Sequence, residues 1–239
     1  MMVALGVIAA RGGSKGFPGK NLRLLDGRPL IEHTILAARN SRLLGDFLVT
    51  TDSPAIAEAA RIAGAKVPFL RPPELATDEV SIWPAVRHAA EQWERASGRQ
   101  AEAVVLLQPT SPLRTAEDID GCITRFLDSE ADICSSVTAT HDSPYFNMVE
   151  PVPGDPDLVR PCTPLMTDRS RRQEAPPVYA VNGAVYVIRR SVLQGLQSQF
   201  RVGRYVAYEM PRARSADIDG PEDLEFAEWL LSRARQALT

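Results

Sequence analysis

The first half of the chain alternates short apolar runs with amphipathic stretches. The apolar runs are rich in β-branched side chains and predict buried strands over residues 3–8, 47–50, 67–70 and 104–107. Between them, apolar side chains recur with the helical period and predict helices over residues 29–40 and 82–97. Another helix is expected between Ser53, as its N-cap, and Gly64. This alternation predicts an α/β fold, an open and mostly parallel sheet with helices on both faces.

Ligands of such sheets bind at the carboxyl ends of the strands. The segments that follow the predicted strands should therefore lie along one edge of the sheet. These segments are the loop that begins at Arg11, the Thr51-Asp52 pair, the region of Arg71, and the residues after Leu107. We expect the functional site at this edge.

Composition narrows the class of protein. The 239 residues suit one large α/β domain or a domain with an insertion, and 44% apolar residues suffice for a sizeable core. A net charge of −3 does not favour a nucleic-acid or anionic-membrane surface. The widely spaced Cys122, Cys134 and Cys162 form no metal motif and fit a reducing, cytoplasmic setting. The brief N-terminal apolar run predicts neither a signal peptide nor a membrane span.

The loop at residues 11–21 contains four glycines and three cations. Glycine lets backbone N–H groups approach a ligand, and lysine and arginine place positive charge beside phosphate oxygens. The loop is neither a Walker A sequence nor a dinucleotide fingerprint. A tight turn that binds nothing is the alternative, and a triphosphate site is the functional interpretation.

The amino-acid sequence of this loop is a specific motif. Ala-Arg-Gly-Gly-Ser-Lys-Gly at residues 10–16, followed by Pro18-x-Lys20-Asn21, closely resembles the opening motif of the CMP-sialic acid synthetases, or acylneuraminate cytidylyltransferases. Ala9 departs from the proline that is usual in the family. The resemblance implies a Rossmann-like nucleotidyltransferase fold that binds CTP. It assigns nucleotide contacts to Ala10, Arg11, Gly12, Gly13, Ser14, Lys20 and Asn21.

A second nucleotide segment follows the run at 67–70. Residues 71–81 read as a proline-stiffened loop in which Asp78 or Ser81 caps the next helix. The resemblance implies, in addition, that Arg71 and Ser81 contact the nucleotide.

Leu-Gln-Pro-Thr-Ser-Pro-Leu-Arg at residues 107–114 is the second long motif. Taken alone, it predicts a rigid strand-to-helix turn, with Thr115 and Asp118 forming a capping box. It also matches a family segment whose glutamine contacts the sugar acid, which implies that role for Gln108.

Residues 142–177 differ from the rest of the chain. Eight of the nineteen prolines lie there, with Arg160, Arg169, Arg171 and Arg172. Prolines at this density preclude a long helix and disfavour central strands. A solvated loop is one interpretation, but a protruding arm is expected because structureless stretches of this length are uncommon in compact domains. The resemblance implies a dimerisation arm and hence a homodimer, with Arg160 or Arg172 meeting a substrate carboxylate across the interface.

Residues 179–188 return to strand character. Asn182-Gly183 alone would suggest a hairpin turn. The family carries Asn-Gly-Ala-x-Tyr inside a strand of its site, which implies that Asn182 and Tyr186, and more weakly Tyr179, contact the sugar. A buried tyrosine of a core strand remains the competing interpretation for Tyr186.

Two carboxylates precede the last predicted helix. Asp217 and Asp219 are two residues apart, so on an extended backbone they face one way and Ile218 the other. Paired carboxylates suit Mg²⁺, which also takes ligands from substrate phosphates. The alternative is that Asp219 only caps the helix that begins at Pro221. The pair matches the metal-binding Asp-Ile-Asp of the family.

The resemblance implies a Mg²⁺-dependent transfer of CMP from CTP to the anomeric hydroxyl of a nine-carbon 2-keto-3-deoxy sugar acid, with release of pyrophosphate. Arg11, Lys20 and Asp217 are the expected catalytic residues. The isolated His33, His88 and His141 offer no catalytic grouping. One alternative is a cytidylyltransferase for the eight-carbon acid of lipopolysaccharide, 3-deoxy-manno-octulosonate. The other is a nucleotide-binding regulatory module without turnover.

Overall fold

The computed structural model describes residues 3–13, 16–163, 173 and 175–236. Contacts divide the chain into two compact units. One consists of Met1–Val137 and Val181–Thr239, and the other is Thr138–Ala180. No helix in the described part of the chain has the length and apolar character that a membrane span requires.

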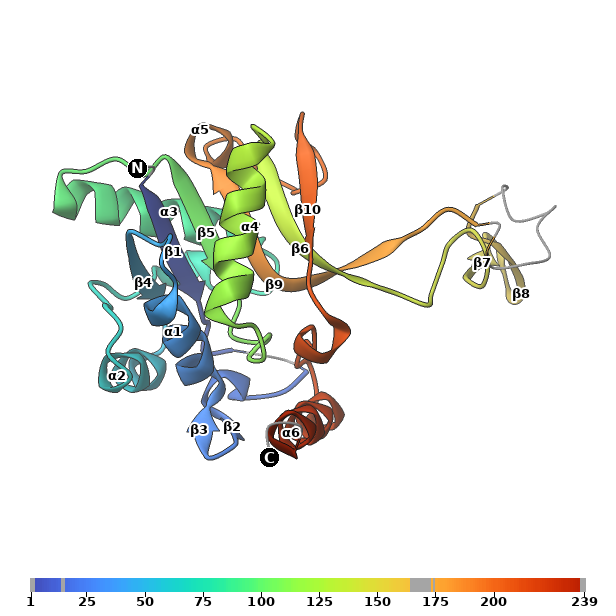
Figure 1. Cartoon of the computed structure of the whole chain (residues 1–239), viewed down its shortest axis with the longest axis horizontal. Helices are drawn as coiled ribbons and strands as arrows, with labels where there is room; N and C mark the ends of the chain where they lie inside the picture. Colours follow the sequence, from blue (N-terminus) through green and yellow to red (C-terminus); the bar gives the residue numbers. More distant parts are fainter. Residues whose placement is uncertain (1–2, 14–15, 164–172, 174, 237–239) are drawn as a thin grey trace. The chain divides into compact units, whose positions relative to one another are not determined.

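A six-stranded sheet with the order β10-β6-β9-β5-β1-β4 forms the first unit's centre (Figure 1). The strands are β1 (Ala4–Ala9), β4 (Asp46–Thr50), β5 (Ala103–Leu107), β6 (Ile133–Ala139), β9 (Tyr179–Arg189) and β10 (Tyr205–Glu209). β1 pairs in parallel with both β4 and β5, and β10 pairs in parallel with β6. β9 runs antiparallel to β5. The prediction of an open, mostly parallel α/β sheet is confirmed.

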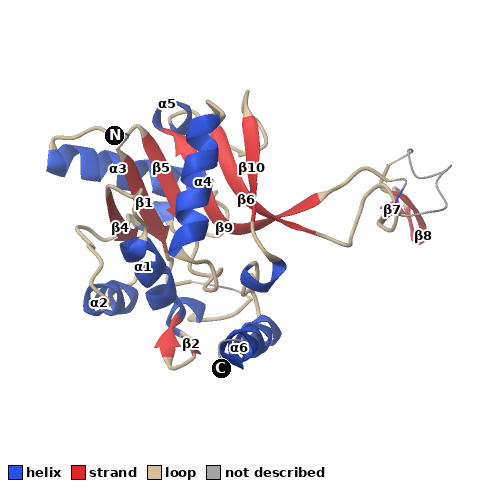
Figure 2. Ribbon diagram, viewed as in Figure 1, coloured by secondary structure: helices blue, strands red, loops and turns tan. Residues whose placement is uncertain are grey.

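Helices cover both faces of this sheet. On one face lie α1 (Leu30–Asn40), α2 (Pro54–Ile62) and α4 (Ala116–Asp128), and on the other α3 (Ile82–Ser97) and α5 (Arg190–Leu193). The last helix, α6 (Pro221–Gln236), packs in a separate apolar cluster with Leu25 and Leu30. Trp83 and Val86 of α3 share one core cluster with Val7 of β1. The next residue of β1, Ile8, belongs to the opposite cluster, which contains side chains of α1, α2 and α4. Figure 2 shows α1 and α4 across this second face. The predicted helices over 29–40 and 82–97 are confirmed.

Two predicted helix caps are also confirmed, whereas Ser81 is the N-cap residue of α3 but makes no side-chain capping hydrogen bond. The Ser53 hydroxyl accepts a hydrogen bond from the Ile56 amide at 3.4 Å, directly before α2. Thr115 and Asp118 form the predicted capping box of α4. These caps fix where each helix begins after its strand.

The predicted strand over residues 67–70 is wrong. Residues 67–70 belong to no strand, and the isolated bridge between Leu48 and Lys66 lies just before them. Pro68 has no amide hydrogen to donate to a ladder. The pattern analysis also left β6, β10 and the short pair β2 (Leu24–Leu25) and β3 (Arg28–Pro29) unpredicted.

The second unit contains a hairpin of β7 (Val149–Val152) and β8 (Asp155–Pro161), which pair antiparallel. Gly154 lies in the turn with a φ of 87°, a conformation that glycine adopts without strain. The unit spans Thr138–Ala180, whereas the sequence predicted an arm over 142–177. Its role in dimerisation stays a prediction.

Candidate active site

A cavity of about 160 Å³ lies at the carboxyl ends of β1 and β5. Its lining includes residues from the glycine-rich loop, the Arg71 segment and the Gln108 motif, but none from β9, the second unit or the Asp-Ile-Asp segment. The lining residues are Ala9, Arg11, Lys20, Asn21, Arg71, Ile82, Gln108, Pro109 and Thr110. Five predicted site residues therefore meet in one cavity, although they are up to 97 positions apart in the sequence.

The glycine-rich loop is pinned by its own backbone and by neighbouring polar groups. The Ala10 amide donates to the Thr50 carbonyl at 3.1 Å. The Gly12 amide donates to an Asp52 carboxylate oxygen at 2.8 Å, and a Cβ at Gly12 would lie 2.9 Å from the Ser53 Cβ. Only glycine therefore fits this close approach of the loop to the start of α2.

Not every loop group points at a ligand. The Gly12 amide is engaged by Asp52, so this N–H group does not contribute to an open anion nest. Asn21 is buried, and its side-chain amide donates to the Arg11 carbonyl at 2.9 Å, which fixes the loop's conformation. Gly13 is exposed with open space around it. Ser14, also predicted to bind nucleotide, lies outside the described residues.

Two arginines bring positive charge to the cavity. Arg11 forms an ion pair with Asp78 at 2.6 Å and donates to the Thr77 carbonyl at 3.3 Å. Arg71 is buried and donates to the Thr50 carbonyl at 2.7 Å. Burial lowers the pKa of Arg71 to about 10; the charge of Asp52 partly opposes this shift, and the nearby Arg11 adds a smaller lowering. A bound anion would offset the burial and the repulsion from Arg11, because it adds negative charge beside this buried guanidinium.

Lys20 connects the loop to the predicted metal segment. Its ammonium lies 3.0 Å from an Asp219 carboxylate oxygen and donates to the Ile218 carbonyl at 3.4 Å. Ile218 is fully buried in a third apolar cluster with Leu30 and Ala227 of α6. The alternating arrangement expected for Asp217 and Asp219 is therefore anchored by an apolar side chain between them.

The two carboxylates suit a divalent cation. Desolvation by neighbouring protein atoms raises the pKa of Asp217, although its side chain is open to solvent on one side. An interaction with Thr110 lowers this pKa, and the charge of Asp219 raises it. A bound cation would offset the desolvation and the repulsion between the like charges. The described residues contain no cluster of three or more candidate ligands, so phosphate oxygens and water would complete the shell of a Mg²⁺ ion.

Asp223, and not Asp219, accepts the hydrogen bonds of the amides at the start of α6. An Asp223 carboxylate oxygen accepts the Asp219 amide at 2.9 Å and the Gly220 amide at 2.8 Å. Asp223 therefore satisfies the amides at the start of α6, and the Asp219 carboxylate pairs with Lys20 instead.

The predicted sugar ligands on β9 are engaged inside the protein. Asn182 is buried, and its side-chain nitrogen donates to the Ser215 hydroxyl oxygen at 2.9 Å. Its side-chain oxygen accepts from the Ser136 hydroxyl at 2.6 Å. Tyr186 is buried in the core cluster of α3, with its ring edge-on to Trp83 at a centroid distance of 5.9 Å. Burial raises the pKa of Tyr186 to about 12.

The remaining predicted residues do not line the cavity. Ser81 lies at the start of α3 and lines a separate hollow of about 340 Å³. Tyr179 is exposed at the start of β9 in the second unit. Arg160 pairs with Glu150 across the hairpin, with an Nη2–Oε1 distance of 2.7 Å. Arg172 lies outside the described residues.

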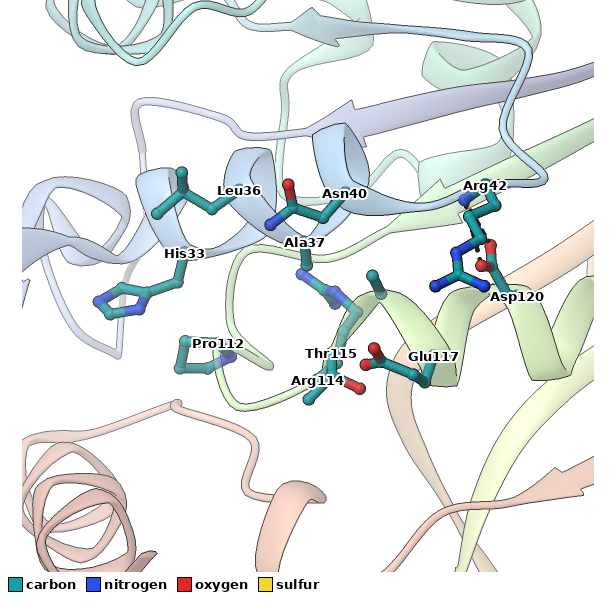
Figure 3. Close-up of a pocket in the computed structure, with 11 residues that line it drawn as sticks. His33, Leu36, Ala37, Asn40, Arg42, Pro112, Arg114, Thr115, Glu117 and Asp120 are labelled. Carbon is teal, nitrogen blue, oxygen red and sulfur yellow. Dashed lines mark hydrogen bonds between the residues drawn. The ribbon is translucent and has the colours of Figure 1, made fainter. Parts of the chain in front are cut away.

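A larger hollow of about 510 Å³ lies between α1 and α4 (Figure 3). Its polar lining includes His33, Asn40, Arg42, Glu117 and Asp120, and none of Arg11, Lys20 and Arg71 lines it. Arg114 reaches it from the second motif and is buried, donating to the Ala184 carbonyl at 2.7 Å and the Gln108 carbonyl at 2.9 Å. Those bonds brace the loop that carries Gln108. The smaller cavity is therefore the candidate active site.

Comparisons with known proteins agree with this assignment. A family profile described as Cytidylyltransferase matches residues 5–234. The chain belongs to this family. The predicted family and the prediction of an enzyme are thereby confirmed.

Two curated relatives of this cytidylyltransferase align over most of its length. The CMP-N,N'-diacetyllegionaminic acid synthase of Legionella pneumophila is 33% identical over 237 residues, which are 99% of this chain and 100% of the relative. The N-acylneuraminate cytidylyltransferase of Streptococcus agalactiae is 32% identical over 221 residues, which are 91% of this chain and 50% of the relative.

A solved structure shares the fold. The structure of a CMP:2-keto-3-deoxy-manno-octonic acid synthetase complexed with CTP matches with a TM-score of 0.74 and 21% identity, covering 97% of this chain and 99% of that chain. At this identity the likeness establishes the common fold and nothing further about the site of this cytidylyltransferase.

Sequence reasoning did not assign the roles of three polar residues around the cavity. Asp52 holds the glycine-rich loop, Asp78 pairs with Arg11, and Thr110 lines the cavity and interacts with Asp217. Asp52 and Thr110 each follow a strand on the expected edge of the sheet, so their positions carried a signal. Nothing in the spacing of Asp78 indicated its partner.

Proposed function

We propose that this cytidylyltransferase transfers CMP from CTP to the anomeric hydroxyl of a nine-carbon 2-keto-3-deoxy sugar acid and releases pyrophosphate. The observation that carries the proposal is the meeting of Arg11, Lys20, Arg71 and Gln108 in one cavity, with Lys20 in contact with Asp219 beside it. Such a site offers cations for a triphosphate, carboxylates for a metal ion, and an amide for a sugar.

The cations act by position and charge. Arg11 and Lys20 would hold the triphosphate oxygens, and Lys20 would stabilise the charge that accumulates on the departing pyrophosphate. The buried Arg71 presents a rigid guanidinium, which suits phosphate better than a mobile side chain would. The attacking hydroxyl oxygen forms a bond to the α-phosphorus and gives up its proton to solvent, as the bond to the bridging oxygen of pyrophosphate breaks in line.

Asp217 and Asp219 would hold Mg²⁺, because they are neighbouring hard oxygen donors and because desolvation, together with the charge of Asp219, raises the pKa of Asp217. When bound, this ion supplies polarisation of the phosphate oxygens. Binding at Asp219 competes with the ion pair to Lys20, so Lys20 would be released towards the phosphates.

The choice of a nine-carbon acid rests on sequence similarity. The relative named for diacetyllegionaminic acid aligns with 33% identity over nearly all of this chain, and the relative named for N-acylneuraminate with 32%. The solved structure named for the eight-carbon acid has 21% identity. Gln108 would contact the sugar. The second unit would form a homodimer and bring Arg160 or Arg172 of one copy to the carboxylate of the acid in the other.

The test is a panel of sugar acids incubated with CTP and Mg²⁺, with products identified by mass spectrometry. We expect a CMP ester of a nonulosonic acid, such as legionaminic, sialic or pseudaminic acid. A CMP ester formed only with 3-deoxy-manno-octulosonate would support the eight-carbon alternative. The absence of any CMP ester, with CTP bound, would support the regulatory module.

A further inference from the structure

The segment that carries Asp217 and Asp219 is held at several points. We call residues 210–219 the carboxylate strap. The Met210 amide donates to the Val137 carbonyl at 2.7 Å, and the Ile218 amide donates to the Thr110 carbonyl at 2.8 Å. Between these ends the strap contains the short 3-10 helix η5 (Arg212–Arg214), so its middle depends on side chains for its attachment.

Arg214 makes the strongest of these attachments. Its Nε donates to one carboxylate oxygen of Asp118 at 2.8 Å, and its Nη2 donates to the other at 2.7 Å. Asp118 is fully buried on α4, and its carboxylate also accepts the Thr115 amide at 3.0 Å. A bidentate guanidinium–carboxylate pair fixes orientation as well as distance. Arg214 therefore ties the strap to the first turn of α4, and this attachment point lies three residues before Asp217.

The close approach of α4 to β10 makes this contact possible. A Cβ at Gly121 would lie 2.5 Å from ring atoms of Tyr208, so the tyrosine ring occupies the space of a missing side chain on α4. β10 ends at Glu209, directly before the strap. The contact between the Tyr208 ring and Gly121 thus fixes the distance between α4 and the first residue of the strap.

We propose that Arg214 is a positioning residue that holds Asp217 and Asp219 in the geometry for a divalent cation, an inference that rests on the metal site of the proposed function. Arg214 contacts neither carboxylate of the metal pair in the described hydrogen bonds and ion pairs. Its effect passes through the backbone of the strap.

A through-space effect of the Arg214 charge and a positioning effect predict opposite changes in metal affinity when Arg214 is removed, which makes the proposal testable. Removal of a cation near two carboxylates would strengthen the binding of a metal ion through space and weaken the binding of an anionic nucleotide. Loss of positioning would weaken metal binding and leave metal-free nucleotide binding unchanged. General loss of structure would weaken both.

The experiment compares the dissociation constant of CTP in the presence and absence of Mg²⁺, measured by calorimetry with the full chain and no sugar acid. The dissociation constant without Mg²⁺ divided by the constant with Mg²⁺ reports the coupling between metal and nucleotide. We expect Arg214→Ala to lower this ratio about tenfold, the size typical for loss of a residue that orients metal ligands. Arg214→Lys keeps the charge without the bidentate fork and should also lower it.

Arg212→Ala is the matched control, because Arg212 lies on the same 3-10 helix and is exposed. Its ratio should equal that of the wild type. The double variant Asp118→Asn/Arg214→Ala avoids an unpaired buried carboxylate, and it should show the same lowered ratio if Arg214→Ala alone does not fold.

An unchanged or increased ratio in the folded Arg214 variants would overturn the proposal. Asp217→Ala separates this failure from failure of the metal site itself. If Asp217→Ala lowers the ratio and the Arg214 variants do not, only the positioning role is wrong. If Asp217→Ala leaves the ratio unchanged, the proposed metal site is wrong as well.

Discussion

At the residue scale, Lys20 joins the two parts of the site. It lines the cavity with Arg11 and Arg71, and its ammonium also contacts the carboxylate strap through Asp219 and the Ile218 carbonyl. An ammonium has three donors, so one remains for a phosphate oxygen even with both contacts made. The side chain is thus oriented before a nucleotide binds, which reduces the entropy lost on binding.

We predict that Lys20→Ala lowers turnover on the order of a hundredfold, because a fixed cation would no longer stabilise the leaving pyrophosphate. The measurement is kcat and the KM for CTP at saturating sugar acid. Lys66→Ala is the control, because Lys66 also pairs with an aspartate, Asp46, but does not line the cavity. Equal kinetic constants for the two variants would contradict the role of Lys20.

We predict that Asp217→Ala and Asp219→Ala also lower turnover on the order of a hundredfold or more, because each removes a carboxylate from the proposed metal site. The measurement is turnover against Mg²⁺ concentration, beside a melting curve for each variant. Asp223→Ala is the control, because Asp223 caps α6 and should cost about 1 kcal/mol of stability with near-normal turnover. A wild-type metal dependence in the Asp217 variant would contradict the metal site.

Sequence motifs predicted most of the residues that line the cavity, but not the hydrogen-bond partners of each side chain. The motifs follow strands, so the order of elements sufficed to bring Arg11, Arg71 and Gln108 together. Asn182 is different, because its amide is satisfied by Ser136 and Ser215, which are 46 and 33 positions away in the sequence. No local pattern reveals such long-range hydrogen bonds.

At the element scale, β1 leads directly into the glycine-rich loop. The packing of β1 beside β4 depends on the absence of a side chain at Gly6. Gly6 is paired with Phe47 in the parallel ladder, and a Cβ at Gly6 would lie 2.7 Å from the Phe47 Cβ. A Cβ cannot swing away as the end of a long side chain can. The spacing of these two strands therefore requires glycine at this position.

We predict that Gly6→Ala lowers the free energy of unfolding by about 1–3 kcal/mol, because the added methyl overpacks the sheet. The measurement is the midpoint of denaturant unfolding at constant slope. Gly195→Ala is the control, because a Cβ there would meet nothing within 4 Å. A Gly6 variant as stable as this control would contradict the packing argument.

There are physical reasons why the sequence pattern did not predict β6 and wrongly predicted a strand over residues 67–70. β6 was hidden because Ser135 and Ser136 are polar yet fully buried, and the Ser136 hydroxyl is satisfied by Asn182 and by the Val185 carbonyl on the adjacent strand. The apolar run at 67–70 looked like a strand, but Pro68 interrupts the ladder and Leu70 is exposed. The continuous apolar run of β1 and the helical period of α3 were predicted correctly.

At the scale of the whole molecule, the second unit has apolar side chains without a cover in the described chain. Met148, Val149, Leu158 and Val159 on and beside its hairpin are exposed. Exposed apolar side chains gathered in a small unit are typical of an interface between proteins. A second copy of this chain is the partner that we propose.

We predict a homodimer at micromolar concentration and a weaker dimer in Leu158→Asp, because a charge on the hairpin opposes burial. Light scattering measures both. Ile62→Asp is the control, because Ile62 is also an exposed aliphatic residue but lies on α2 of the first unit. A monomeric wild-type protein, or equal effects of the two variants, would contradict the proposed interface.

CMP transfer is tested most directly by pyrophosphate release from the purified protein with CTP, Mg²⁺ and a nonulosonic acid. We predict steady release that requires all three components and falls when ATP, GTP or UTP replaces CTP. Lys20→Ala and Asp217→Ala should abolish most of it, and Lys66→Ala should not. Binding of CTP without pyrophosphate release in the presence of every acid tested, or equal turnover with a purine triphosphate, would contradict the proposed reaction.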